Sequence, residues 1–65
     1  MANSVALAEV LRRIQIVEDN LRELEEQAAA YSGAADEERF AARIADQQAK
    51  LDALRKQRAA LMNED

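Results

Sequence analysis

Apolar residues recur every three or four positions through the first half of the chain. They fall into two columns, and within each column the members lie seven residues apart. This is the pattern of a helix whose apolar stripe packs against another helix. It predicts a helix over about residues 5–31. The columns contain Leu7, Ile14, Leu21 and Ala28, and then Val10, Val17, Leu24 and Tyr31.

The second half repeats the pattern in a different register. The new register is displaced from the old one by two residues, whereas a continuous coiled coil absorbs insertions of three or four. We therefore expect the helix to break, with a turn at about residues 32–35 and a second helix over about 36–62. The second pair of columns contains Phe40, Gln47, Leu54 and Leu61, and then Ile44, Leu51 and Arg58.

The residues at the break are those that end and start helices. Gly33 is the only glycine, and we expect it to be a left-handed C-cap of the first helix. Asp36 is a plausible N-cap of the second helix. Because a short link makes consecutive helices antiparallel neighbours, residues 1–65 are predicted to form one all-α helical hairpin.

Folding the chain back at this turn matches the two stripes. Leu24 then lies opposite Ile44, and Val17 lies opposite Leu51. Each core position on one helix finds a core position on the other, which favours the hairpin. The predicted core consists of Leu7, Val10, Ile14, Val17, Leu21, Leu24, Ala28, Phe40, Ile44, Leu51, Leu54 and Leu61.

Two layers of this core contain a polar residue. Gln47 falls opposite Leu21, with Asn20 close by, and Arg58 falls opposite Val10. A buried polar side chain that finds a partner can determine register or partner choice at a cost in stability. Alternatively, Gln47 is hydrated and Arg58 covers its neighbour with its aliphatic stem. Asn20, Gln47 and Arg58 are therefore candidate specificity residues.

Further apolar residues lie outside the predicted seam. A stripe of alanines on the outer side of the second helix would let another helix approach closely. Alanine is also the best helix former and often fills surface positions, so the stripe has a simpler explanation. Three larger apolar residues widen this surface. The candidate interface residues are Leu11, Ile16, Ala35, Ala42, Ala49, Ala53, Ala60 and Met62.

Composition narrows the range of functions. The 65-residue chain contains no cysteine and no histidine, so disulfides, zinc sites and thiol or imidazole catalysis are excluded. We expect no enzymatic activity, cofactor or metal. No apolar stretch suits a membrane span or a signal peptide, so we expect a soluble cytoplasmic protein. One core in so small a chain supplies little stability, which favours self-association.

Charge suggests how two hairpins would associate. The net charge is −4, which disfavours a nucleic-acid partner unless a local basic patch overcomes the repulsion. Residues 20–47, around the turn, contain seven acids and three arginines. The open half carries a net charge of +2 when Glu64 and Asp65 are left out. An antiparallel pair places each acidic turn beside a basic open end. We therefore expect a homodimer of antiparallel hairpins, an up-and-down four-helix bundle.

The length, the register and the turn Tyr31-Ser32-Gly33-Ala34-Ala35-Asp36-Glu37-Glu38 resemble those of the Rop family of plasmid-encoded RNA-binding proteins. The resemblance implies a dimeric four-helix bundle with an RNA-binding face on the paired first helices. On the first helix this chain has Arg12, Arg13, Gln15 and Arg22. Its size and pattern are also similar to those of the small helical-hairpin chaperones of secretion-needle subunits.

Two functions follow from these patterns. The first is a non-enzymatic interaction or assembly module, such as a small chaperone, adaptor or regulatory subunit. It would act through helix–helix packing with a second copy or with another helical protein. The alternative is a small nucleic-acid-binding regulator of Rop-like architecture. It would hold phosphates with basic residues of the open end, namely Arg12, Arg13, Arg55, Lys56 and Arg58.

Overall fold

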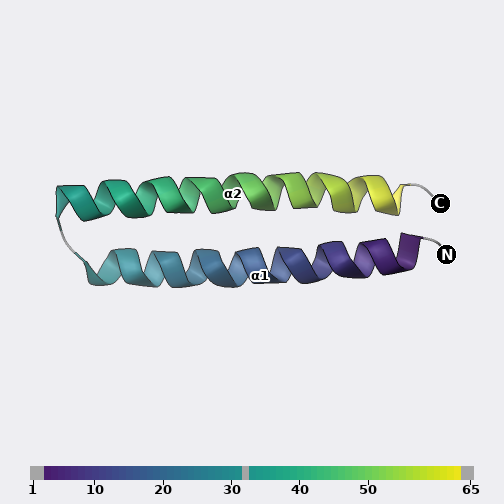
Figure 1. The fold of residues 1–65 in the computed structure, drawn as a ribbon, viewed down its shortest axis with the longest axis horizontal. Helices are drawn as coiled ribbons and strands as arrows, with labels where there is room; N and C mark the ends of the chain where they lie inside the picture. Colours follow the sequence, from purple (N-terminus) through teal and green to yellow (C-terminus); the bar gives the residue numbers. More distant parts are fainter. Residues whose placement is uncertain (1–2, 32, 64–65) are drawn as a thin grey trace.

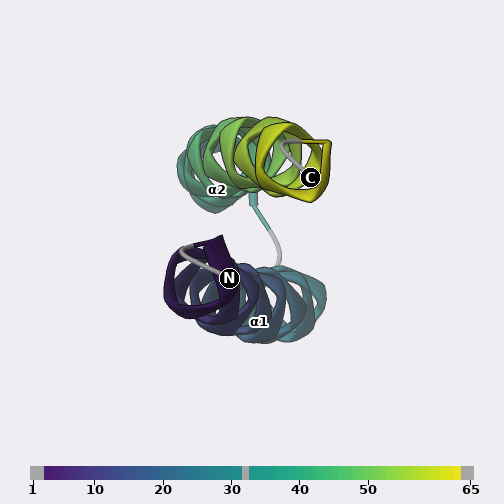
Figure 2. The ribbon, with the colours of Figure 1, turned by 90° about the vertical axis from the view of Figure 1, so that its right-hand side faces the viewer.

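The computed structural model describes residues 3–31 and 33–63 of the chain. Helix α1 spans Asn3–Ala30, and helix α2 spans Ala34–Met62. The two helices run antiparallel, with both termini at one end and the connection at the other (Figure 1). Viewed from the end, they lie side by side as a single layer and are slightly inclined to each other (Figure 2). The predicted helical hairpin is confirmed.

The helix ends differ by a few residues from the expected ones. Helix α1 begins at Asn3 and ends at Ala30, one residue before Tyr31. Helix α2 begins at Ala34, so the expected turn over 32–35 is shortened. Ser32, which belongs to that turn, lies outside the described residues. The helices are therefore slightly longer than the apolar pattern indicates, because alanines and polar residues at their ends also adopt helical structure.

The expected caps at the turn are wrong in detail. Gly33 has a positive φ of 136°, but its ψ of 142° is extended rather than left-handed helical. It occupies the N-cap position of α2, where its carbonyl accepts a hydrogen bond from the Glu37 N–H at 3.0 Å. Asp36 is not the N-cap and lies in the first turn of α2. There its carboxylate, like that of Glu37, is close to the positive end of the helix dipole.

The core is a single seam between the helices. Among the described residues, five side chains are buried. Four of them are on α1, and the fifth is Leu51 of α2. Ile44, Leu54 and Leu61 pack against this cluster from the other helix. The remaining predicted core residues are half-buried. The buried residues are Val10, Ile14, Val17, Leu21 and Leu51, and the other half-buried ones are Leu7, Leu24, Ala28 and Phe40.

A seam of this kind buries few residues because each helix has only one neighbour. The Cα atoms occupy an envelope of 50 × 14 × 10 Å, which is long and thin. Both broad sides of the hairpin are therefore open, and no polar or charged residue is buried within the described range. Neither helix, as far as it is described, has an apolar stretch that could span a bilayer.

Replacement of Leu51 by alanine tests the seam. Leu51 is 7% exposed and is the only buried residue of α2 among those described, so Leu51→Ala should lower the free energy of unfolding by about 2–5 kcal/mol. Urea unfolding followed by circular dichroism, at one protein concentration throughout, measures this loss. Gln48→Ala, at an exposed position on the same helix, should change stability by less than about 0.5 kcal/mol. Equal effects of the two substitutions would contradict the seam.

Replacement of Gly33 by alanine tests the turn. A Cβ atom added at Gly33 would meet no atom within 4 Å, so only the backbone conformation opposes a side chain. Because its φ is positive, Gly33→Ala should lower the unfolding free energy by about 1–2 kcal/mol. A synthetic chain with D-alanine at this position should retain the stability, since D-residues favour positive φ. If L- and D-alanine have the same effect in thermal unfolding, the turn conformation is wrong.

Candidate functional site

The two broad sides of the hairpin carry different residues. On one side, three neighbouring hollows follow the seam from its middle to the turn. We call this side the groove face. We define it by the exposed or half-buried residues around those hollows, which are Arg13, Ile16, Asn20, Glu23, Leu24, Gln27 and Tyr31 of α1 and the turn and Asp36, Arg39, Phe40, Ala42, Arg43, Asp46, Gln47, Lys50, Ala53 and Leu54 of α2.

The hollow nearest the middle of the hairpin is apolar. It has a volume of about 360 Å³. Val17 of α1, which is buried, and Leu54 of α2, which is half-buried, both line it. Its other apolar walls are Ile16, which is 45% exposed, and Ala53. The side chains of Arg13 and Lys50 complete the lining. The site thus combines an apolar surface with positive charge from both helices.

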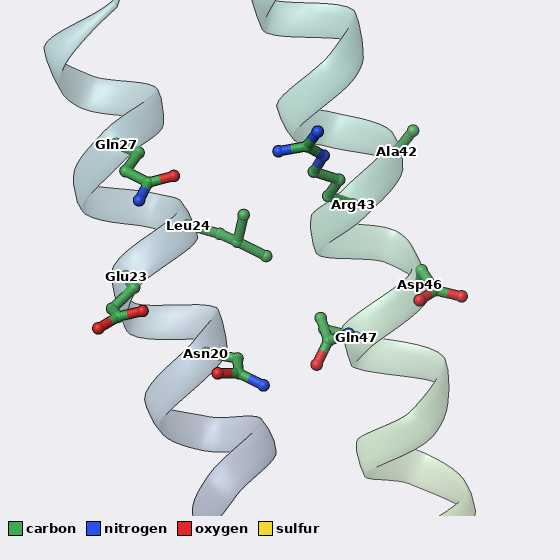
Figure 3. A pocket seen from close by; sticks show the side chains of 8 residues that line it. All are labelled: Asn20, Glu23, Leu24, Gln27, Ala42, Arg43, Asp46 and Gln47. Carbon is green, nitrogen blue, oxygen red and sulfur yellow. The ribbon is translucent and has the colours of Figure 1, made fainter.

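Most residues that line the next hollow toward the turn are polar or charged, and we call it the polar hollow. It has a volume of about 490 Å³, and Figure 3 shows its lining side chains. Asn20 of α1 and Gln47 of α2 extend into the space between the helices, one from each side (Figure 3). Arg43 extends its guanidinium group from α2 toward α1, and Leu24 points toward α2 between these polar groups. Two of the candidate specificity residues, Asn20 and Gln47, therefore line the same hollow.

The third hollow lies at the turn and contains the only aromatic pair. The rings of Tyr31 and Phe40 stack with centroids 5.8 Å apart and planes 24° from parallel. Gln27 and Arg43 line both this hollow and the preceding one, so the two are continuous. Tyr31 is 58% exposed although it belongs to an apolar column. The helix ends before this residue, and its ring covers Phe40 from outside the seam.

The opposite broad side is defined by a contact between the helices. Glu18 of α1 and Arg55 of α2 form an ion pair at 3.9 Å, the only interhelical one among the described residues. Leu11 and Met62 lie seven residues away from them on the same sides of their helices, toward the open end, and are 45% and 60% exposed. We call these four residues the ion-pair face.

The basic residues of the open end are largely paired with carboxylates. Arg12 Nη2 donates to Glu9 Oε1 at 2.7 Å, and Arg13 Nε donates to the same oxygen at 3.0 Å. The hydrogen bonds from Arg12 and then Arg13 lower the pKa of Glu9, while partial desolvation opposes them. The same contact with Glu9 raises the pKa of Arg12. Together with Arg55, three of the five open-end cations already have an acidic neighbour.

The candidate interface residues do not form one surface. Ile16 and Ala53 line the apolar hollow, whereas Leu11 and Met62 belong to the ion-pair face. The alanines of the outer stripe are all exposed, and Ala42 lies at the margin of the polar hollow. Of the candidate specificity residues, Asn20 is exposed, while Gln47 and Arg58 are half-buried. The stripe members without a hollow are Ala35, Ala49 and Ala60.

Sequence reasoning named Arg13, Asn20 and Gln47, but it did not single out the other polar residues that line the hollows. Gln27 of α1, and Arg43 and Lys50 of α2, are prominent among these. Each stands one position before an apolar column, so the residues on each helix share one flank. This spacing is the signal that would have identified them. The spacing is informative only once the structure shows that these residues of α1 and α2 lie on the same broad side of the hairpin.

The described residues contain no group of three or more acidic side chains placed to hold a metal ion. No protein family model, curated protein or solved structure matches this chain. The side chains on the two faces offer apolar surface, amide groups and paired charges.

Loss of Arg12 tests the ion pairs of the open end. Because its hydrogen bond is the main cause of the depressed Glu9 pKa, Arg12→Ala should raise that pKa toward its ordinary value. Any stabilisation from the pair exists above the ordinary carboxyl pKa and is lost as the pH falls through the depressed one. A carbon-detected NMR titration of the Glu9 carboxyl measures the change. Arg22→Ala, which removes a contact with Asp19 instead, should leave it unchanged. An unaltered Glu9 pKa in Arg12→Ala would refute the pairing.

Proposed function

We propose that this protein is a non-enzymatic interaction module that acts through helix–helix packing. Its first partner is a second copy of itself, and two antiparallel hairpins form an up-and-down four-helix bundle. The outer surface of such a bundle would then be available to another helical protein, as expected of a small chaperone, adaptor or regulatory subunit. No cofactor takes part in this function.

The observation that carries the proposal is the excess of exposed surface. A compact monomer of 7.3 kDa exposes about 4200 Å². This chain exposes 4956 Å², which is larger by about 800 Å². An excess of about 800 Å² is what each partner contributes to a protein–protein interface of standard size. A second hairpin packed against one broad side would cover an area of this size.

The small core supports the same conclusion. The five buried side chains among the described residues are few for a chain that must offset the conformational entropy of two long helices. Below about 70–80 residues, folded proteins rely on disulfides, metals, idealised packing or oligomerisation. This chain has no cysteine and no histidine. Self-association is the route that would add buried apolar area.

The distribution of charge supports the antiparallel orientation. Seven acids and three arginines lie in residues 20–47, whereas the open half is net basic when Glu64 and Asp65 are excluded. Two parallel hairpins would bring their acidic turns together. The antiparallel arrangement places each turn beside the basic open end of the other copy, where the charges attract.

The nucleic-acid alternative is weaker. Binding to a phosphate backbone needs several cations that are free to face it. At the open end, Arg12 and Arg13 contact Glu9, and Arg55 contacts Glu18. A nucleic acid would have to displace these carboxylates and to approach a chain of net charge −4.

Sedimentation equilibrium tests the dimer directly. At micromolar concentration the protein should have about twice the 7.3 kDa mass of one chain. Since dimerisation couples association to folding, the melting temperature should rise with protein concentration. A folded species of one-chain mass, with a melting temperature independent of concentration, would exclude self-association.

A further inference from the structure

We infer that the groove face is the surface on which the second copy docks, with the two-fold axis of the dimer crossing the hairpin near the apolar hollow. This inference rests on the proposed dimer and adds which side of the hairpin is buried. The occupant of the hollow is the same apolar surface of the other copy. Ile16 of each chain would then lie against the groove face of its partner.

The position of the hollow is suited to a two-fold contact. In a symmetric dimer, the same patch is used by both copies and must be complementary to itself. The lining residues Ile16 and Lys50 lie near the middle of α1 (Asn3–Ala30) and of α2 (Ala34–Met62), respectively. An antiparallel copy rotated about this point places the apolar hollow against its equivalent. The polar hollow with Asn20 and Gln47 then lies nearer the rim, as expected for an apolar interface centre with polar surroundings.

Charges around the hollow are compatible with this contact. Arg13 and Glu23 lie on opposite sides of the middle of α1, so the rotation brings Arg13 of one copy toward Glu23 of the other. Glu9 would then lose Arg13 as a partner but keep Arg12, which is the nearer of the two at 2.7 Å against 3.0 Å. Lys50 lies close to the axis, where two copies would repel, but its Nζ is 3.3 Å from Asp46 Oδ2 of the same chain.

The ion-pair face is less suited to an antiparallel copy. Its centre is occupied by Glu18 and Arg55, which already contact each other across the helices. Its apolar residues, Leu11 and Met62, lie toward the open end. An antiparallel copy would bring its acidic turn half against them, so their apolar surface would meet charged residues rather than apolar ones.

A matched pair of substitutions separates the two faces. Leu11 and Ile16 are on the same helix and are both 45% exposed, but they belong to opposite sides. Ile16→Glu should weaken dimerisation by roughly a hundredfold or more, because a charge would be buried at the interface centre. Leu11→Glu should leave the dimer dissociation constant within about threefold of that of the original chain. Sedimentation equilibrium measures all three proteins, and circular dichroism follows their helicity.

A second pair of substitutions tests the groove face independently, in case Ile16→Glu unfolds the hairpin. Ala53→Glu changes the groove face from α2, and Ala45→Glu is its control at another exposed position of that helix. Dissociation by Ala53→Glu with retained helicity supports the inference. Loss of the dimer in Leu11→Glu but not in Ile16→Glu or Ala53→Glu overturns the groove face and leaves the proposed dimer intact. A monomeric original chain overturns both.

The orientation is tested with a single spin label. The chain has no cysteine, so Ala35→Cys, near the turn, can be labelled uniquely. In the antiparallel dimer the two labels should be about 40–50 Å apart, since each turn lies beside the opposite open end. Parallel hairpins would place them within about 20 Å, a distance that would overturn the two-fold arrangement described above. Pulsed electron paramagnetic resonance measures this separation.

Discussion

The apolar seam between α1 and α2 holds the hairpin together. Val10, Ile14, Val17 and Leu21 form a continuous stripe on α1, and Leu51 is the buried residue that α2 contributes. Because two helices can share only one seam, the apolar residues outside it cannot be buried within the hairpin. The surface excess and the exposed aliphatic side chains both result from this geometry, and both favour a partner.

The seam also makes the two broad sides of the hairpin chemically different. Residues one position before each apolar column point to one side, and those one position after point to the other. On this chain the first set includes Arg13 and Lys50 beside an apolar hollow, whereas the second contains the Glu18–Arg55 ion pair. A symmetric partner would therefore distinguish the two sides by apolar contact at the centre and by charge at the rim.

The turn decides how the two helices are matched. The apolar registers differ by two residues, and Gly33 allows the chain to reverse with a positive φ before α2 begins at Ala34. The early start of α2 places Asp36 and Glu37 in its first turn, where they face the positive end of the helix dipole. The residues of the turn thus favour the same chain reversal that the pairing of the two apolar stripes requires. Such agreement is expected of a sequence that specifies one fold.

The two helices, the break between them and their apolar stripes could be predicted from the amino-acid sequence alone, because seven-residue periodicity indicates which side of a helix is buried. The pairing of side chains outside the stripe needed the tertiary structure. Leu11 and Ile16 look equivalent along the chain, yet only Ile16 lines a hollow shared with α2. The cap at Gly33 and the stacking of Tyr31 on Phe40 were also decided by the path of the turn. Periodicity contains no information on these features, since the cap depends on the backbone conformation at Gly33 and the stacking brings together rings from the two sides of the turn.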